Sequence, residues 1–75
     1  MPIYKFEETV EKIATAREVK LYDTHKRLLR QIKKDLESRE ITAEDVPDRL
    51  KDNDDFKFKF NFSSDDFKAI VSAIK

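Results

Sequence analysis

Glycine is absent from the 75-residue sequence, although it makes up about 7% of an average protein. Phosphate-binding loops, dinucleotide-binding fingerprints and serine nucleophile elbows all need glycine where the backbone approaches a ligand or adopts a positive φ angle. The sequence therefore argues against these three kinds of site. It also predicts that residues such as Asn53 or Asn61 take any left-handed backbone positions, in a framework of helices and short strands.

Cysteine is absent too, which excludes disulfides, thiol nucleophiles and cysteine-ligated zinc. No stretch approaches the roughly 20 apolar residues of a membrane span, and the first eight residues turn acidic where a signal peptide would be apolar. We therefore expect a cytoplasmic protein without membrane contacts. Its length fits one small domain over residues 1–75, and its composition, 39% hydrophobic and 43% charged, fits a folded domain with a very polar surface.

A long helical region is predicted between residues 7 and 40, which contain neither proline nor glycine. Its apolar side chains recur at helical spacing and form one stripe: Val10, Ile13, Ala14, Leu21, Leu28, Ile32 and Leu36. Val19 lies opposite the stripe, and Asp23 can cap a second helix. We therefore predict two helices, over 7–18 and 24–39. The alternative is one unbroken helix of about 50 Å, which would need a partner to cover it.

Two further helices are predicted in the second half of the chain. Thr42 and Asp45 have the spacing of a capping box and precede a short helix over 43–51. Ser63 or Ser64 can cap a final helix, whose acidic first turn suits the positive end of the helix dipole. The apolar positions of that final helix follow i, i+3, i+4 and i+7: Phe67, Ile70, Val71 and Ile74.

Residues 56–62 alternate four phenylalanines with Lys57, Lys59 and Asn61, a pattern typical of a strand with one apolar face. A strand needs a partner, and the best one in the chain is the short alternating segment 2–6. The predicted fold class is therefore α+β and predominantly helical, with the helices packed against a small sheet built on strand 56–62. The phenylalanines are expected in the core, and the polar residues would border an open edge that could pair with another copy.

Charge is segregated although the formal net charge is zero. Residues 20–34 carry six basic side chains and one acidic, a net charge of +5, whereas residues 35–55 carry nine acidic and three basic, a net charge of −6. The basic side chains form a candidate surface for nucleic acid or a partner, which we call the basic ridge: Lys20, Lys26, Arg27, Arg30, Lys33 and Lys34. The alternative is a solvated helix face, partly neutralised by the acidic segment folding near it.

No catalytic, metal-binding or cofactor-binding residue is predicted. His25 is the only histidine and lies near the edge of the apolar stripe, so we expect a partly exposed boundary residue without a catalytic partner. The acidic run from Asp52 lacks the glycine and glutamate of a calcium loop, since Lys57 and Ser63 occupy those positions.

These observations favour a non-enzymatic regulatory or adaptor protein that binds another protein or a second copy of itself, as a homodimer. The motivation is the small size, the missing catalytic groups and an orphan strand that could pair between copies. The alternative is a small nucleic-acid-binding regulator that uses the basic face of the helix around residues 24–39.

Overall fold

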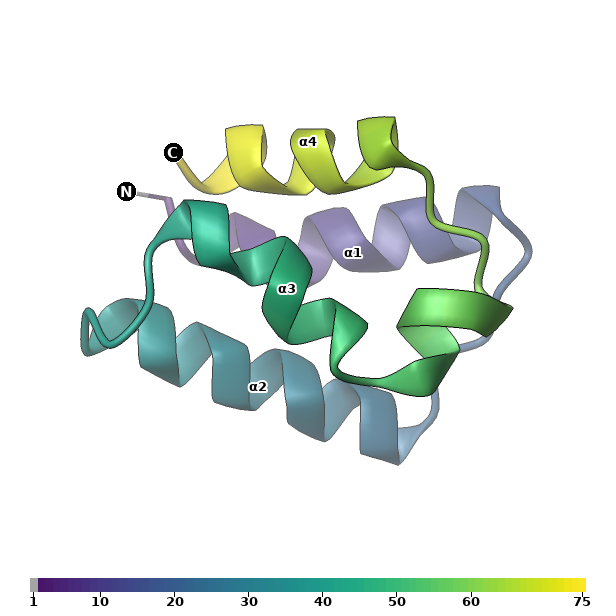
Figure 1. The fold of residues 1–75 in the computed structure, drawn as a ribbon, viewed down its shortest axis with the longest axis horizontal. Coiled ribbons are helices and arrows are strands. Elements are labelled where there is room, and N and C mark those ends of the chain that lie inside the picture. Colours follow the sequence, from purple (N-terminus) through teal and green to yellow (C-terminus); the bar gives the residue numbers. More distant parts are fainter. Residues whose placement is uncertain (1) are drawn as a thin grey trace.

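The computed structural model describes residues 2–75, and these residues form helices and no strand (Figure 1). The predicted α+β class is therefore wrong, and the domain is a small helical bundle measuring 30 × 22 × 18 Å. In chain order the elements are α1 (Lys5–Ala16), α2 (Asp23–Glu37), a 3₁₀ turn η1 (Ala43–Asp45), α3 (Val46–Lys51), a π-helical turn η2 (Asp55–Lys59) and α4 (Ser64–Ile74). None of these helices is both long and apolar enough to cross a membrane.

The region 7–40 forms two helices, as predicted, and the alternative of one unbroken helix is wrong. Helix α1 ends in a Schellman motif, in which the Glu18 N–H donates to Thr15 O and the Val19 N–H donates to Ala14 O. Glu18 holds a positive φ of 57°, the conformation that glycine usually supplies at this position. The chain can therefore reverse direction, so that α1 and α2 run antiparallel (Figure 1).

Helix α2 ends in the same way without glycine. The Arg39 N–H donates to Leu36 O and the Glu40 N–H donates to Asp35 O, with Arg39 at a φ of 64°. Asn61 also has a positive φ, as predicted. Asn53 does not, and its side-chain oxygen instead accepts a hydrogen bond from the Asp55 N–H at 2.9 Å.

The core lies where α1 packs against both α2 and α4, with α3 and η2 closing the remaining side (Figure 1). Buried side chains come from every element, so the chain closes its core with its own residues. The core cluster comprises Phe6, Val10, Leu29, Ile32, Leu36, Ala43, Val46, Leu50, Phe56, Phe60, Phe67, Ile70 and Ile74.

The predicted strand over 56–62 is wrong, because its first residues form the π-helical turn η2. The Phe60 N–H donates to Asp55 O at 2.8 Å, five residues back. Phe56 and Phe60, which are four residues apart, are 1% and 7% exposed, whereas Phe58 between them is 69% exposed. Only two of the four rings are therefore fully in the core, and Phe62 is half-buried against it.

The strand fails because its intended partner is also helical. The Lys5 N–H donates to Pro2 O and the Phe6 N–H donates to Ile3 O, both at 3.0 Å, so segment 2–6 forms the turn that starts α1. A lone strand would leave its backbone groups without partners, whereas a helical turn pairs them locally. In an alternating sequence every second residue is apolar, so some apolar residues are also four positions apart. That spacing places them on the same side of a helical turn, so the alternation fits a helix as well as a strand.

Both predicted C-terminal helices are confirmed. The short helix appears as η1 followed by α3, and the Thr42 N–H donates to Asp45 Oδ2 at 2.9 Å in the predicted capping box. Ser63 caps α4: its Oγ accepts from the Asp66 N–H at 3.2 Å, and its own N–H donates to Asp66 Oδ2 at 2.9 Å. Arg17, at the end of α1, approaches the same carboxylate oxygen to 2.8 Å and ties α1 to α4.

Asp66 provides a pH-dependent test of the α4 cap. Burial would raise the pKa of Asp66, but the Ser63 N–H and the Arg17 guanidinium outweigh it and hold this pKa below its ordinary value of 3.8. A lowered pKa in the folded state means that the ionised carboxylate stabilises the fold at neutral pH and that this stabilisation is lost on acidification. We expect Asp66→Asn to lower the free energy of unfolding by about 1 kcal/mol near neutral pH.

The difference between wild type and Asp66→Asn should narrow as the pH falls through and below about 4, because the wild-type carboxyl then becomes protonated. Urea denaturation across the pH range measures the free energy of unfolding of the wild type and of the variant at each pH. Asp65→Asn, a change at the exposed neighbour in the same turn, is the matched control. A difference that stays constant down to acidic pH would show that the Asp66 carboxylate does not cap α4.

Candidate partner-binding surface

The basic ridge lies on the outward side of α2 and in the connection that precedes it. Its five members on α2 fall within an arc of about 120° on the side of the helix opposite its buried residues. Lys20 lies in the connection that precedes α2. Five of the six side chains are exposed and Lys33 is half-buried. The structure therefore places all the predicted ridge residues on or beside one outward-facing side of the bundle.

None of the six ridge cations makes an ion pair with a carboxylate of residues 2–75. The ion pairs within this part of the chain lie elsewhere: Lys12–Glu8, Arg17–Asp66, His25–Asp55, Arg49–Asp35 and Lys75–Glu44. Within the acidic segment 35–55, Asp35 pairs with Arg49 and Asp55 pairs with His25, and neither partner belongs to the ridge. Direct neutralisation of the ridge by this segment, which the sequence offered as an alternative, is not seen.

Carboxylates of α1 border one side of the ridge. Glu7 and Glu11 line a shallow recess of about 210 Å³ together with Lys26, Leu29 and Arg30. Two acidic residues of α2 itself, Asp23 and Glu37, are exposed near its ends. The surface is therefore a strip of cations with acidic margins. It is not a broad positive field.

The predicted strand-edge interface of Lys57, Lys59 and Asn61 does not exist, because the segment is helical and has no strand edge. The Lys57 ammonium lies over the exposed Phe58 ring, 5.1 Å from its centroid. Lys59 lines a recess between η2 and the α1–α2 connection, and Asn61 occupies the left-handed position that ends the turn. These three residues therefore have separate roles.

His25 is 4% exposed, so the expectation of a partly exposed boundary residue is wrong. It occupies the first turn of α2, where its Nδ1 accepts a hydrogen bond from the backbone N–H of Tyr22 at 3.0 Å. The Nε2 atom lies 2.7 Å from Asp55 Oδ2 in η2. Because Nδ1 is an acceptor, Nε2 carries the proton and donates it to the carboxylate. The contact fastens the start of α2 to η2.

One incomplete signal for this contact is visible in the sequence, namely the position of His25 near the edge of the apolar stripe. Its partner Asp55 lies 30 residues away in an acidic run that resembles a solvated turn. A histidine that acts as a general base needs a free nitrogen lone pair. Both ring nitrogens of His25 are engaged, so the geometry is that of a structural clasp.

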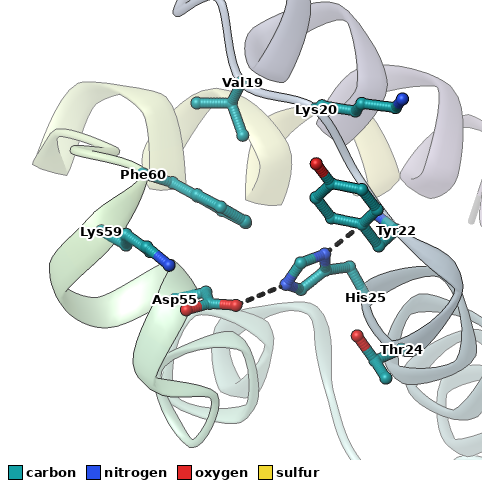
Figure 2. A pocket seen from close by; sticks show the side chains of 8 residues that line it. All are labelled: Val19, Lys20, Tyr22, Thr24, His25, Asp55, Lys59 and Phe60. Atoms are coloured by element: carbon teal, nitrogen blue, oxygen red, sulfur yellow. Dashed lines mark hydrogen bonds and ion pairs between the residues drawn. The ribbon is translucent and has the colours of Figure 1, made fainter.

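A recess of about 470 Å³ opens beside this clasp, between the α1–α2 connection and η2 (Figure 2). Phe60 and Tyr22 face it from opposite sides, Val19 lies at its upper margin in Figure 2, and the His25–Asp55 pair lies below. Lys20, Thr24 and Lys59 complete its lining. The recess could not be predicted from the sequence, because its walls come from segments about 35 residues apart.

Two predicted features lie close together in this region. Lys20, a member of the basic ridge, and Lys59, a residue of the predicted strand, line the same recess. Among residues 2–75, no cluster of three or more histidine, aspartate or glutamate side chains could hold a metal ion. Comparisons of the chain with protein-family models, with curated proteins and with solved structures gave no match.

Proposed function

We propose that the protein is a non-enzymatic regulatory or adaptor protein, and that its basic ridge docks onto an acidic surface of another protein. The observation that carries this proposal is the set of six cations gathered on one side of the bundle, none ion-paired within residues 2–75. Charged residues that the fold does not pair internally are available to steer and orient a partner of opposite charge. Strands of two copies cannot pair through residues 56–62, since this segment forms a helical turn and the residues after it, and no strand.

Two observations support a protein as the partner in preference to a nucleic acid. The chain has no net charge, whereas nucleic-acid-binding domains usually carry excess positive charge. In addition, Glu7 and Glu11 border the ridge at Lys26 and Arg30, so a phosphate backbone lying across α2 would approach carboxylates. A protein surface can place single acidic side chains on the ridge and avoid this margin.

Charge reversal on the ridge tests the proposal. We expect the triple variant Lys26→Glu, Arg30→Glu and Lys34→Glu to lose partner binding by about tenfold or more, because three attractive contacts become repulsive. The measurement is affinity capture from a lysate of the source cells, with and without nuclease, followed by quantitative mass spectrometry. The amount of captured partner protein should fall in the ridge variant and should not change when nuclease is added.

The matched control is the triple variant Lys5→Glu, Lys57→Glu and Lys68→Glu, which makes the same change in net charge at exposed sites away from the ridge. It should retain the partner. Equal loss in both triple variants would exclude the ridge as the interface. Capture that nuclease abolishes, together with a shift of nucleic-acid probes at low salt, would assign the ridge to nucleic acid instead.

A further inference from the structure

We infer that the acidic partner inserts an aromatic side chain into the recess between Tyr22 and Phe60, so that the recognised motif is an acidic segment with one aromatic residue. This inference rests on the proposed function and names the partner chemistry that it leaves open. The recess, the ridge and the exposed Tyr22 ring provide the observations.

The walls of the recess suit an aromatic ring. Phe60 is fixed, because it is almost fully buried and packs edge-on against His25, with ring centroids 4.9 Å apart. Tyr22 is 58% exposed and tilts by 49° against the same histidine, and in Figure 2 its ring faces Phe60 across the opening. Aromatic pairs prefer such edge-on and tilted arrangements, so an inserted ring would find favourable neighbours on both sides. The volume of about 470 Å³ lies within the usual range of ligand pockets.

The charges around the recess favour acidic neighbours on either side of that ring. Lys20 and Lys59 line it from two different segments, and the Lys20 ammonium lies 5.4 Å from the centroid of the Tyr22 ring. Asp55 is the only carboxylate in the lining, and its Oδ2 is already bound to His25. The opening therefore presents two cations to a partner.

The recess also continues into the basic ridge. Val19 lines the recess and also a neighbouring hollow, whose lining includes Lys26. Lys26 in turn lines the hollow beside Arg30. Glu11 lines both hollows and Glu7 lines the second, so the carboxylates border this route on its α1 side. An acidic segment that places its aromatic residue between Tyr22 and Phe60 would therefore continue along the outward face of α2, over the ridge cations and away from α1. Aromatic anchors in pockets surrounded by weaker polar contacts are the usual source of affinity in protein interfaces.

Peptide titrations followed by NMR test this inference on the whole chain labelled with ¹⁵N. One short Glu-rich peptide carries a single central Trp, and its control carries Ala in that place. We expect the Trp peptide to bind about tenfold or more tightly and to shift the resonances of Val19, His25 and Phe60. The Ala peptide should bind weakly and shift only the resonances of the ridge residues on α2, Lys26 to Lys34, and not those of the recess.

Two variants of exposed aromatic residues sharpen the test. Tyr22→Ala removes one wall of the recess and should abolish the preference for Trp, whereas Phe58→Ala removes an exposed ring outside the recess and should leave it unchanged. Circular dichroism checks that both variants remain folded. Loss of the preference in both variants would contradict a specific role for the recess.

The remaining outcomes separate this inference from the proposed function. Equal affinity for the two peptides, with shifts on α2, would overturn the aromatic anchor and leave the acidic partner standing. If neither peptide binds at low salt, both the acidic partner and the aromatic anchor are excluded. If AMP shifts the resonances of the recess residues and the Trp peptide does not, the recess binds a small molecule and the inference is wrong. The same shifts on raising the protein concentration alone would assign the recess to a second copy of the chain.

Discussion

Replacing Phe56 with alanine is expected to lower the free energy of unfolding by about 3–5 kcal/mol, the usual cost of removing a buried phenylalanine ring. Phe56 is 1% exposed and packs edge-on against Phe60, Phe62 and His25, with ring centroids 5.0–5.8 Å apart. Alanine at this position would leave a cavity among these rings. Because small domains have total stabilities of only about 5–15 kcal/mol, this one change removes much of the margin.

Phe58→Ala is the matched control, since it makes the same chemical change two residues away on an exposed ring. We expect it to change the free energy of unfolding by no more than about 0.5 kcal/mol. Urea denaturation monitored by circular dichroism measures both variants. Phe56→Leu, which leaves a smaller cavity, keeps the comparison possible if the alanine variant does not fold.

The pair of variants also separates the two structures that the sequence allows for this segment. In a strand, Phe56 and Phe58 would share one face and would cost similar amounts when truncated. In the helical turn η2 they differ, because only residues four apart lie on the same side. Equal and large losses at both positions would therefore contradict the π-helical turn.

The helices could be predicted from the sequence because their signals are local. The apolar stripe, the Thr42–Asp45 box and the Ser63 cap each act within a few residues, and all three appear in the structure with boundaries shifted by at most about two residues. The break between α1 and α2 was also indicated, since Val19 lies opposite the stripe. The residues at the left-handed positions that end α1 and α2 were not, because Glu18 and Arg39 take the place of the expected asparagine.

The π-helical turn could not be predicted in the same way, because the conformation of residues 56–62 depends on a segment that is distant in the sequence. Alternation over 56–62 is compatible with a strand and with a turn that buries only Phe56 and Phe60. What decides between them is whether a second strand exists, and segment 2–6 instead starts α1. Asn53 then supplies a side-chain acceptor at 2.9 Å for the Asp55 N–H, where the helical turn begins.

The candidate site likewise has one part that could be predicted from local sequence and another part that depends on distant segments. The outward position of the basic side chains could be predicted, since six cations in 15 residues are visible in the sequence, and five of the six are exposed in the structure. The absence of carboxylate partners could not be predicted, because it depends on where the acidic segment 35–55 folds. The recess beside His25 was missed because its walls come from two segments that are distant in the chain.

His25→Ala is the second change with a large expected effect, a loss of about 2–4 kcal/mol in the free energy of unfolding. The variant removes a buried ring that packs edge-on against Phe56 and Phe60, which leaves a cavity. It also removes the acceptor for the Tyr22 N–H and the donor to Asp55. The Asp55 side chain is 38% exposed, so water can replace its lost partner and most of the expected loss comes from the cavity. Thr24→Ala, at the exposed neighbour, is the control and should cost no more than about 0.5 kcal/mol.

A double-mutant cycle between His25→Ala and Asp55→Ala distinguishes the clasp from simple loss of core volume. If the 2.7 Å contact fastens α2 to η2, the two losses should fall short of additivity by about 0.5–3 kcal/mol, because either single change already breaks the contact. Asp55→Asn should lower the free energy of unfolding by less than Asp55→Ala does, since the amide oxygen can still accept a hydrogen bond from His25 Nε2. Strictly additive losses would mean that His25 acts only through packing. Tyr22 and Phe60 would then be held across the recess without help from Asp55.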